Sequence, residues 1–242
     1  MNTKTLLIAL IVLAAAAGIY FGTRQAPPEP VVFDTTAEQA SSTTTPEAYP
    51  SANSLLTGQA TSITSPTSQP MQNRIATFTT NKGVIKIEIF EDTMPITTGN
   101  FIKLAEAKYF DGIKFHRVIS DFMIQSGDPL TKDDSKSAYW GTGGPGYAIP
   151  DEHIAGELLT NTRGTISMAN SGPNSGGSQF FINVANNTFL DFNKEPLASK
   201  HPVFGRVIAG MDVVDAISVA PRNQRDVPID LIIIQSITIG IN

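Results

Sequence analysis

The stretch KFHRVISDFMIQSGDP, Lys114 to Pro129, places a guanidinium and a carboxamide within an otherwise apolar run. Arg117 and Gln125 have neighbours typical of a protein core, such as Val118 and Ile124. A buried charge without a partner is costly, so Arg117 needs either a carboxylate or a ligand. The stretch therefore predicts a cleft whose apolar wall carries two polar groups.

Two further amide side chains, Asn170 and Gln179, occur in the stretch GTISMANSGPNSGGSQFFI. Four long or planar polar side chains with apolar neighbours suit a groove for an uncharged, amide-rich ligand. Extended polypeptide is such a ligand. The alternative is that these stretches are simply core strands, which fits Phe180 but neither Arg117 nor the amides.

Other chemistries lack the residues that they need. The run GTGGPG, residues 141–146, matches a dinucleotide-binding pattern, but Pro145 lies inside it and Pro150 follows, so no helix opens there. No serine lies in a G-x-S-x-G elbow, the three histidines lack metal-ligand spacing, and cysteine is absent. A net charge of −5 gives no basic surface for nucleic acid. We therefore expect no cofactor, no metal and no nucleic-acid partner.

The elements that would position these residues begin near Asn73. IATFTT and VIKIEIF flank a short turn, and the alternating isoleucines of the second stretch predict a half-buried hairpin. MPITTGNFIKLAEAKYF and GMDVVDAISV have helical spacing, and Pro95 stands where a first helical turn tolerates proline. The pattern predicts a mainly β fold, a barrel capped by two helices. Its further strands are expected at residues 114–119, 122–125, 165–169, 179–184, 203–207 and 231–239.

The preceding residues divide into two segments. Residues 1–23 contain an apolar run of roughly 18 residues, which at ~1.5 Å each nearly matches a ~30 Å hydrocarbon core, whereas cleavable signals usually have ~7–15. We expect a single-pass membrane anchor with the domain that follows it outside the cytoplasm. Signal cleavage, giving a secreted or periplasmic protein, is the alternative. Residues 24–72 are rich in Ser, Thr and Pro and predict a disordered linker to a domain at 73–242.

At the stretches quoted above, the sequence resembles the cyclophilin family of peptidyl-prolyl cis-trans isomerases, in a bacterial-like form. FHRVI, GTGGPG, SMAN, GSQFFI and HPVFGRV occur in the family's order, and the resemblance covers residues 73–242. It implies a closed eight-stranded antiparallel β-barrel capped by two α-helices. It also implies a monomeric, cofactor-independent enzyme that acts on proline-containing polypeptides.

Residue-by-residue matching to the family implies the composition of the site. Arg117 corresponds to the family's catalytic arginine, and Gln125 would orient it. The catalytic residues would be Arg117, Phe122, Gln125 and His201. The substrate-binding residues would be Met123, Gly141, Ala169, Asn170, Ser171, Gln179, Phe181, Phe189 and Leu190.

The sequence departs from the family in three places. Phe189 stands where many eukaryotic members have Trp, so cyclosporin binding is expected to be weakened. Ser171 stands where Ala is common. The loops at 129–140 and 191–200 are longer than in compact members, and as rims of the groove they would influence substrate choice.

Two functions follow from these residues. The first is an active isomerase that assists protein folding outside the cytoplasm. The second is a membrane-tethered module or chaperone that binds proline-containing segments with little turnover. The retention of Arg117, Phe122 and His201 favours the enzyme.

Overall fold

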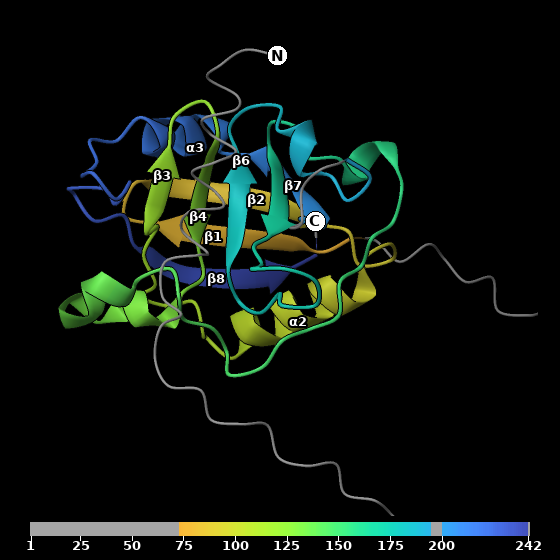
Figure 1. The fold of residues 1–242 in the computed structure, drawn as a ribbon, viewed down its shortest axis with the longest axis horizontal. Coiled ribbons are helices and arrows are strands. Elements are labelled where there is room, and N and C mark those ends of the chain that lie inside the picture. Colours follow the sequence, from red (N-terminus) through yellow and green to blue (C-terminus); the bar gives the residue numbers. More distant parts are fainter. Residues whose placement is uncertain (1–72, 195–199, 242) are drawn as a thin grey trace, which may run out of the picture. The chain divides into compact units, whose positions relative to one another are not determined.

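The computed structural model describes residues 73–194 and 200–241, and strands dominate them (Figure 1). The predicted anchor and linker, residues 1–23 and 24–72, lie outside the described residues. The strands are β1 (Ile75–Thr80), β2 (Gly83–Ile89), β3 (Arg117–Ile119), β4 (Met123–Ser126), β5 (Thr165–Met168), β6 (Phe180–Asn183), β7 (Val203–Ala209) and β8 (Ile234–Gly240). The helices are α2 (Pro95–Glu106) and α3 (Met211–Ser218), with short 3-10 helices at Pro129–Lys132, Asp134–Tyr139, Glu157–Leu159 and Thr188–Leu190.

The strands form one eight-stranded sheet in the order β3-β4-β6-β5-β7-β2-β1-β8, and every neighbouring pair is antiparallel. The sheet curls so that the segment before β3 meets the segment before β8. A bridge pairs Lys114 with Ile233, and Phe115 N–H donates to the Ile232 carbonyl at 2.9 Å. The mainly β, barrel-like fold predicted from the sequence is confirmed.

Alternation along the strands creates the core. In β2, Ile85, Ile87 and Ile89 are buried whereas Lys86 is exposed, because successive side chains of a strand point to opposite faces. The inward-facing rows meet a cluster of aromatic rings around Phe101 of α2. Its ring lies 5.2–6.0 Å from those of Phe78, Phe110, Phe180 and Phe204.

The two helices lie above and below the strands in the view of Figure 1. Helix α2 begins at Pro95, whose missing N–H falls where a helix has no internal acceptor. The next two N–H groups, of Ile96 and Thr97, donate to the buried carboxylate of Glu152. Glu152 therefore provides hydrogen-bond acceptors for the free N–H groups at the start of α2. The same two bonds hold the loop around Glu152, which follows the glycine-rich segment, against the helix.

We predict that a chain beginning at Asn73 folds without residues 1–72. Strand β1 begins at Ile75, and both of its partners, β2 and β8, belong to the retained part. Urea unfolding followed by circular dichroism should give one cooperative transition. A chain beginning at Val84, which lacks β1, should not fold. Insolubility or gradual unfolding of the chain from Asn73 would contradict the proposed boundary.

Candidate active site

Strands β3, β4 and β6, at one end of the sheet order, carry a row of predicted site residues on the outer face. The strand register pairs Arg117 with Gln125 and Gln125 with Phe181. Directly opposed residues of antiparallel strands point to the same face, so the three side chains are neighbours. The adjacent row points inward and is fully buried: Val118, Ile124, Ile182 and Ile166.

Arg117 and Gln125 begin a chain of amide hydrogen bonds. Arg117 Nη1 donates to Gln125 Oε1 (3.4 Å), and Gln125 Nε2 donates to Gln179 Oε1 (3.0 Å). Gln179 Nε2 donates to the carbonyls of Gly141 (3.0 Å) and Gly143 (2.8 Å). Because these carbonyls can only accept, the Gln179 amide has one orientation, and its Oε1 must face Gln125. The loop at residues 141–146, called the glycine loop below, thus orients Gln179. Gln179 in turn orients Gln125 so that its Oε1 faces the guanidinium of Arg117.

The glycine loop itself is held by Asp128, a residue that was not predicted from the sequence. Its buried carboxylate accepts from the backbone N–H groups of Leu130 (2.7 Å), Gly141 (2.5 Å) and Gly143 (3.1 Å). A Cβ at Gly143 would lie 2.1 Å from Asp128 Oδ1, so this close approach requires glycine. The available signal in the sequence was an Asp just beyond a predicted strand, in the run QSGDP, with a glycine-rich run from Gly141.

A cluster of apolar side chains, called the apolar wall below, adjoins the amide chain. Five elements contribute to it: the turn before β4, strand β4, strand β6, the 3-10 helix Thr188–Leu190 and the segment before β7. The Phe181 and His201 rings meet edge to face at 5.3 Å, and the Arg117 guanidinium carbon lies 5.9 Å from the centre of the Phe122 ring. The side chains of the wall are all buried: Phe122, Met123, Phe181, Leu190 and His201.

The remaining predicted residues lie along the two flanks of this wall. Ala169 N–H donates to the Gln179 carbonyl (3.0 Å), which places the residues after β5 beside the amide chain. Asn170 Nδ2 donates to the Lys200 carbonyl (2.7 Å), and Ser171 is exposed. Phe189 is half-buried and stacks on Phe122, with the ring centres 6.0 Å apart.

Burial lowers the pKa of two site residues. It lowers the pKa of Arg117, and the carboxylate of Asp226 opposes this effect. It also lowers the pKa of His201, against the opposing hydrogen bond to Met168. His201 Nδ1 lies 3.0 Å from the Met168 carbonyl, which can only accept, so the neutral ring carries its proton on Nδ1. A neutral His201 suits the apolar wall.

His116, next to Arg117, is buried. Neither ring nitrogen has a hydrogen-bond partner among the described residues, and polar groups of Lys114 and Gln179 lie nearby but outside hydrogen-bonding geometry. Burial lowers the pKa of His116 to about 4, although Asp128 opposes the shift. His116 is therefore neutral in the folded protein at pH 7.

We predict an acid destabilisation that originates at His116. The unfolded chain takes up a proton near pH 6.5, whereas the folded protein resists protonation until about pH 4, so stability is present above pH 6.5 and is lost as the pH falls. Between pH 7 and pH 5 the loss from this residue should be about 2 kcal/mol. Urea unfolding at both pH values should show that His116→Gln loses less stability over this range than the unsubstituted protein. An equal loss in both proteins would exclude His116 as its source.

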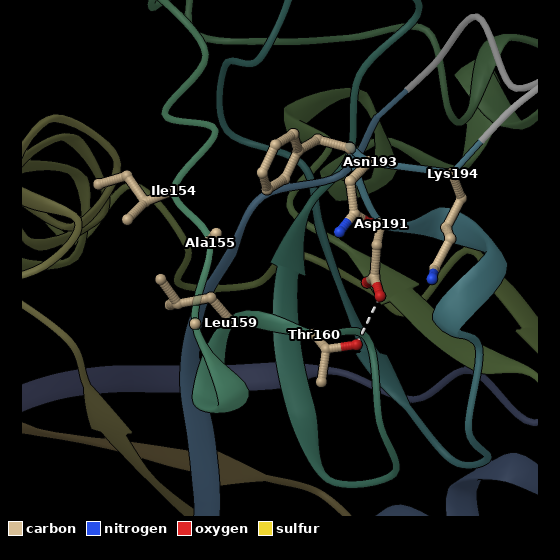
Figure 2. Close-up of a pocket in the computed structure, with 9 residues that line it drawn as sticks. Ile154, Ala155, Leu159, Thr160, Asp191, Asn193 and Lys194 are labelled. Carbon is tan, nitrogen blue, oxygen red and sulfur yellow. Dashed lines mark hydrogen bonds between the residues drawn. The ribbon is translucent and has the colours of Figure 1, made fainter.

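A separate hollow of about 180 Å³ lies between the loop at 154–160 and the residues at 191–194 (Figure 2). None of the predicted site residues lines it. Within residues 73–194 and 200–241, no group of three or more His, Asp or Glu side chains is placed to hold a metal ion.

Comparison with known proteins identifies the family. Residues 75–239 match the family described as "Cyclophilin type peptidyl-prolyl cis-trans isomerase/CLD". Relatives named peptidyl-prolyl cis-trans isomerase-like 3 are 39% identical to this chain: over 166 residues in Dictyostelium discoideum (69% of this chain, 95% of the relative) and over 167 in Rattus norvegicus (69% and 96%). A crystal structure of a Cryptosporidium parvum cyclophilin type peptidyl-prolyl cis-trans isomerase is 32% identical, with a TM-score of 0.59 over 71% of this chain and 99% of that one. The chain belongs to the cyclophilin-type peptidyl-prolyl cis-trans isomerase family, which confirms the predicted enzyme class.

Two predictions are corrected by these findings. The relatives are eukaryotic isomerase-like proteins, so the bacterial-like form is not supported. The predicted location at a membrane outside the cytoplasm, anchored or after cleavage, is contradicted by the same relatives. In addition, no helix within residues 73–194 and 200–241 has the length and apolar character to cross a bilayer. That prediction depended on the apolar length of residues 1–23, which lie outside the described residues, and length alone does not establish a location.

Proposed function

We propose that residues 73–242 bind extended, proline-containing polypeptide across the outer face of β4 and β6 and rotate its Xaa–Pro bonds, with Arg117 as the electrostatic catalyst. One observation carries the proposal. Arg117 lies beside the apolar wall, and its hydrogen-bond partner in the described part of the chain is the amide of Gln125 rather than a carboxylate. The remaining guanidinium donors are available to a ligand, which accounts for a charge within an apolar stretch.

The reaction needs no covalent chemistry. Rotation about an Xaa–Pro bond removes amide resonance, with a barrier of ~18–20 kcal/mol and uncatalysed times of tens to hundreds of seconds. Twisting pyramidalises the prolyl nitrogen and exposes its lone pair. An N–H donor of Arg117 aimed at this nitrogen stabilises the twisted state more than either planar state, which lowers the barrier.

The other site residues supply binding and orientation. The apolar wall would hold the proline ring and exclude water, which strengthens the contact with the guanidinium. Gln125, Asn170 and Gln179 would hold the backbone on one side of the bond while the carbonyl on the other side swings. The hydrogen bonds from Gln179 to the glycine loop support this role, because they leave the amide chain with one orientation.

Proline-containing polypeptides are the proposed substrates, and assistance to their folding is the proposed role. A structure of the Cryptosporidium parvum protein, 32% identical and with a TM-score of 0.58, was solved in the presence of the dipeptide Ala-Pro. We expect the domain to act as a monomer. Cyclosporin should bind weakly, because Phe189 lacks the indole N–H of a tryptophan.

A protease-coupled isomerisation assay with a panel of Xaa–Pro peptides tests the proposal. We expect acceleration in proportion to enzyme concentration, and competition by unlabelled Ala-Pro peptides. Peptide binding without acceleration would instead favour a module that binds proline-containing segments with little turnover. Absence of both binding and acceleration would contradict the site itself.

A further inference from the structure

A group of buried polar side chains lies under the apolar wall and was not anticipated from the sequence. The wall combines residues from segments that do not pair with one another: Phe122 precedes β4, whereas His201 precedes β7. Strands β6 and β5 lie between β4 and β7 in the sheet. Two asparagines, Asn161 and Asn187, connect the backbone at these two positions.

Asn161 is fully buried and uses every hydrogen-bonding group of its side chain. Its Nδ2 donates to the His201 carbonyl (3.1 Å) and to Asp191 Oδ1 (2.9 Å). Its Oδ1 accepts from Ser167 Oγ (2.7 Å) in β5 and from Asn183 Nδ2 (3.2 Å) in β6. A buried amide with two donors and two acceptors in use has one orientation and one position. Asn161 therefore fixes the His201 carbonyl relative to both strands.

Asn187 makes the corresponding connection on the other side. Its Nδ2 donates to the Phe122 carbonyl and to Asn183 Oδ1, both at 2.7 Å, and its backbone N–H donates to the Asn161 carbonyl at 2.7 Å. It also precedes the 3-10 helix that carries Leu190. Asn187 as a whole is 3% exposed, so its hydrogen-bonding groups have little access to water.

Asp191 anchors the same network at its outer edge. The carboxylate accepts from the Thr160 hydroxyl, shown as a dashed line in Figure 2, and from the backbone N–H of Asn161 at 2.7 Å. Asp191 directly follows Leu190, and the His201 N–H donates to the Leu190 carbonyl at 3.2 Å. The network thus reaches three residues of the apolar wall through their backbones.

We propose that Asn161 and Asn187 are positioning residues of the isomerase, which hold the walls of the proline pocket at a fixed distance from each other and from Arg117. The inference rests on the proposed site. Both asparagines are buried beneath the apolar wall, 0% and 3% exposed, so neither would contact substrate. Catalysis that depends on one oriented donor is sensitive to small displacements, and a shift of about 1 Å can reduce the rate on the order of a hundredfold. The network is placed to prevent such a shift.

Kinetics of Asn161→Ala, Asn187→Ala and the double variant test this role, with Asn81→Ala as the matched control. Asn81 also uses both ends of its amide on backbone groups, at the Leu231 carbonyl and the Ile233 N–H (2.9 Å each), but in the β1–β2 turn. Isomerisation is measured where urea curves show each protein to be folded. We expect kcat/KM to fall on the order of ten- to a hundredfold for each single variant. The double variant should lose less than the product of the two, because both act through one network.

The control separates positioning from simple stabilisation. Asn81→Ala should lower the urea midpoint without altering kcat/KM. If the Asn161 and Asn187 variants do the same, the inference is overturned. Asn161→Ala removes four buried hydrogen bonds and is the variant more prone to unfold. If it does not fold, the activity of Asn187→Ala alone tests the inference. If the unsubstituted protein had no isomerase activity, the proposed function would be contradicted instead. Nuclear magnetic resonance titration with an Ala-Pro peptide would then test the network, by comparing the peptide affinities of the asparagine variants and the unsubstituted protein.

Discussion

Arg117→Ala is expected to lower kcat and kcat/KM by similar factors, on the order of 10²–10³, or ~3–4 kcal/mol of barrier. The reason is that the guanidinium would contact the prolyl nitrogen mainly in the twisted state, so its removal affects the transition state rather than the bound substrate. Stability should change little. The one hydrogen bond that Arg117 makes to Gln125 is long, at 3.4 Å, and burial of the charge is itself unfavourable. The measurements are isomerisation kinetics and urea midpoints.

Arg206→Ala is a suitable control for the loss of an arginine. Its guanidinium pairs with Glu88 at 2.7 Å on the surface of β7 and β2, away from the apolar wall. Exposed pairs of this kind contribute ~0–1 kcal/mol, so both activity and stability should be nearly unchanged. An Arg117→Ala protein that kept near-normal turnover would remove Arg117 from the catalytic role. One that failed to fold would indicate an arginine with a structural function.

The sequence predicted the elements well where local patterning decides them. The expected strand at residues 203–207 is observed as Val203–Ala209, and the expected helix at GMDVVDAISV as Met211–Ser218. The expected strand at 114–119 is shorter, Arg117–Ile119, and Lys114 instead forms an isolated bridge to Ile233 at the closing edge of the barrel. The alternation of apolar and polar residues along a strand does not show which distant segment will pair with it. The ends of such strands can therefore be located only from the three-dimensional structure.

The same distinction applies to the site. Arg117 and Gln125 could be identified from the sequence because an apolar stretch makes a polar side chain conspicuous. The amide chain through Gln179 to the glycine loop could not, because it depends on the register of β3, β4 and β6. Asn161 and Asn187 gave no signal at all. Each lies in a polar, loop-like stretch, where asparagine is ordinarily a turn residue.

Phe122→Ala should weaken catalysis and stability together, unlike the loss of Arg117. The Phe122 ring is 3% exposed, stacks on Phe189 and adjoins the guanidinium of Arg117. Truncation of a buried phenylalanine costs ~3–5 kcal/mol of stability. Loss of the apolar wall should also reduce kcat/KM ~10–200-fold, chiefly through KM, because the proline ring is held in the planar and twisted states alike.

Phe101→Ala provides the matched comparison, because it removes a ring of equal size on the opposite face of the sheet. Phe101 is 2% exposed and contacts four other aromatic rings of the core. Its truncation should lower the urea midpoint as much as Phe122→Ala, yet leave kcat/KM unchanged in conditions where the protein is folded. If both variants lost activity equally, the loss would reflect general loosening of the barrel, and Phe122 would have no specific part in holding proline. If only Phe122→Ala raised KM, although both variants lose similar stability, the result would place the Phe122 side chain in the proline-binding pocket.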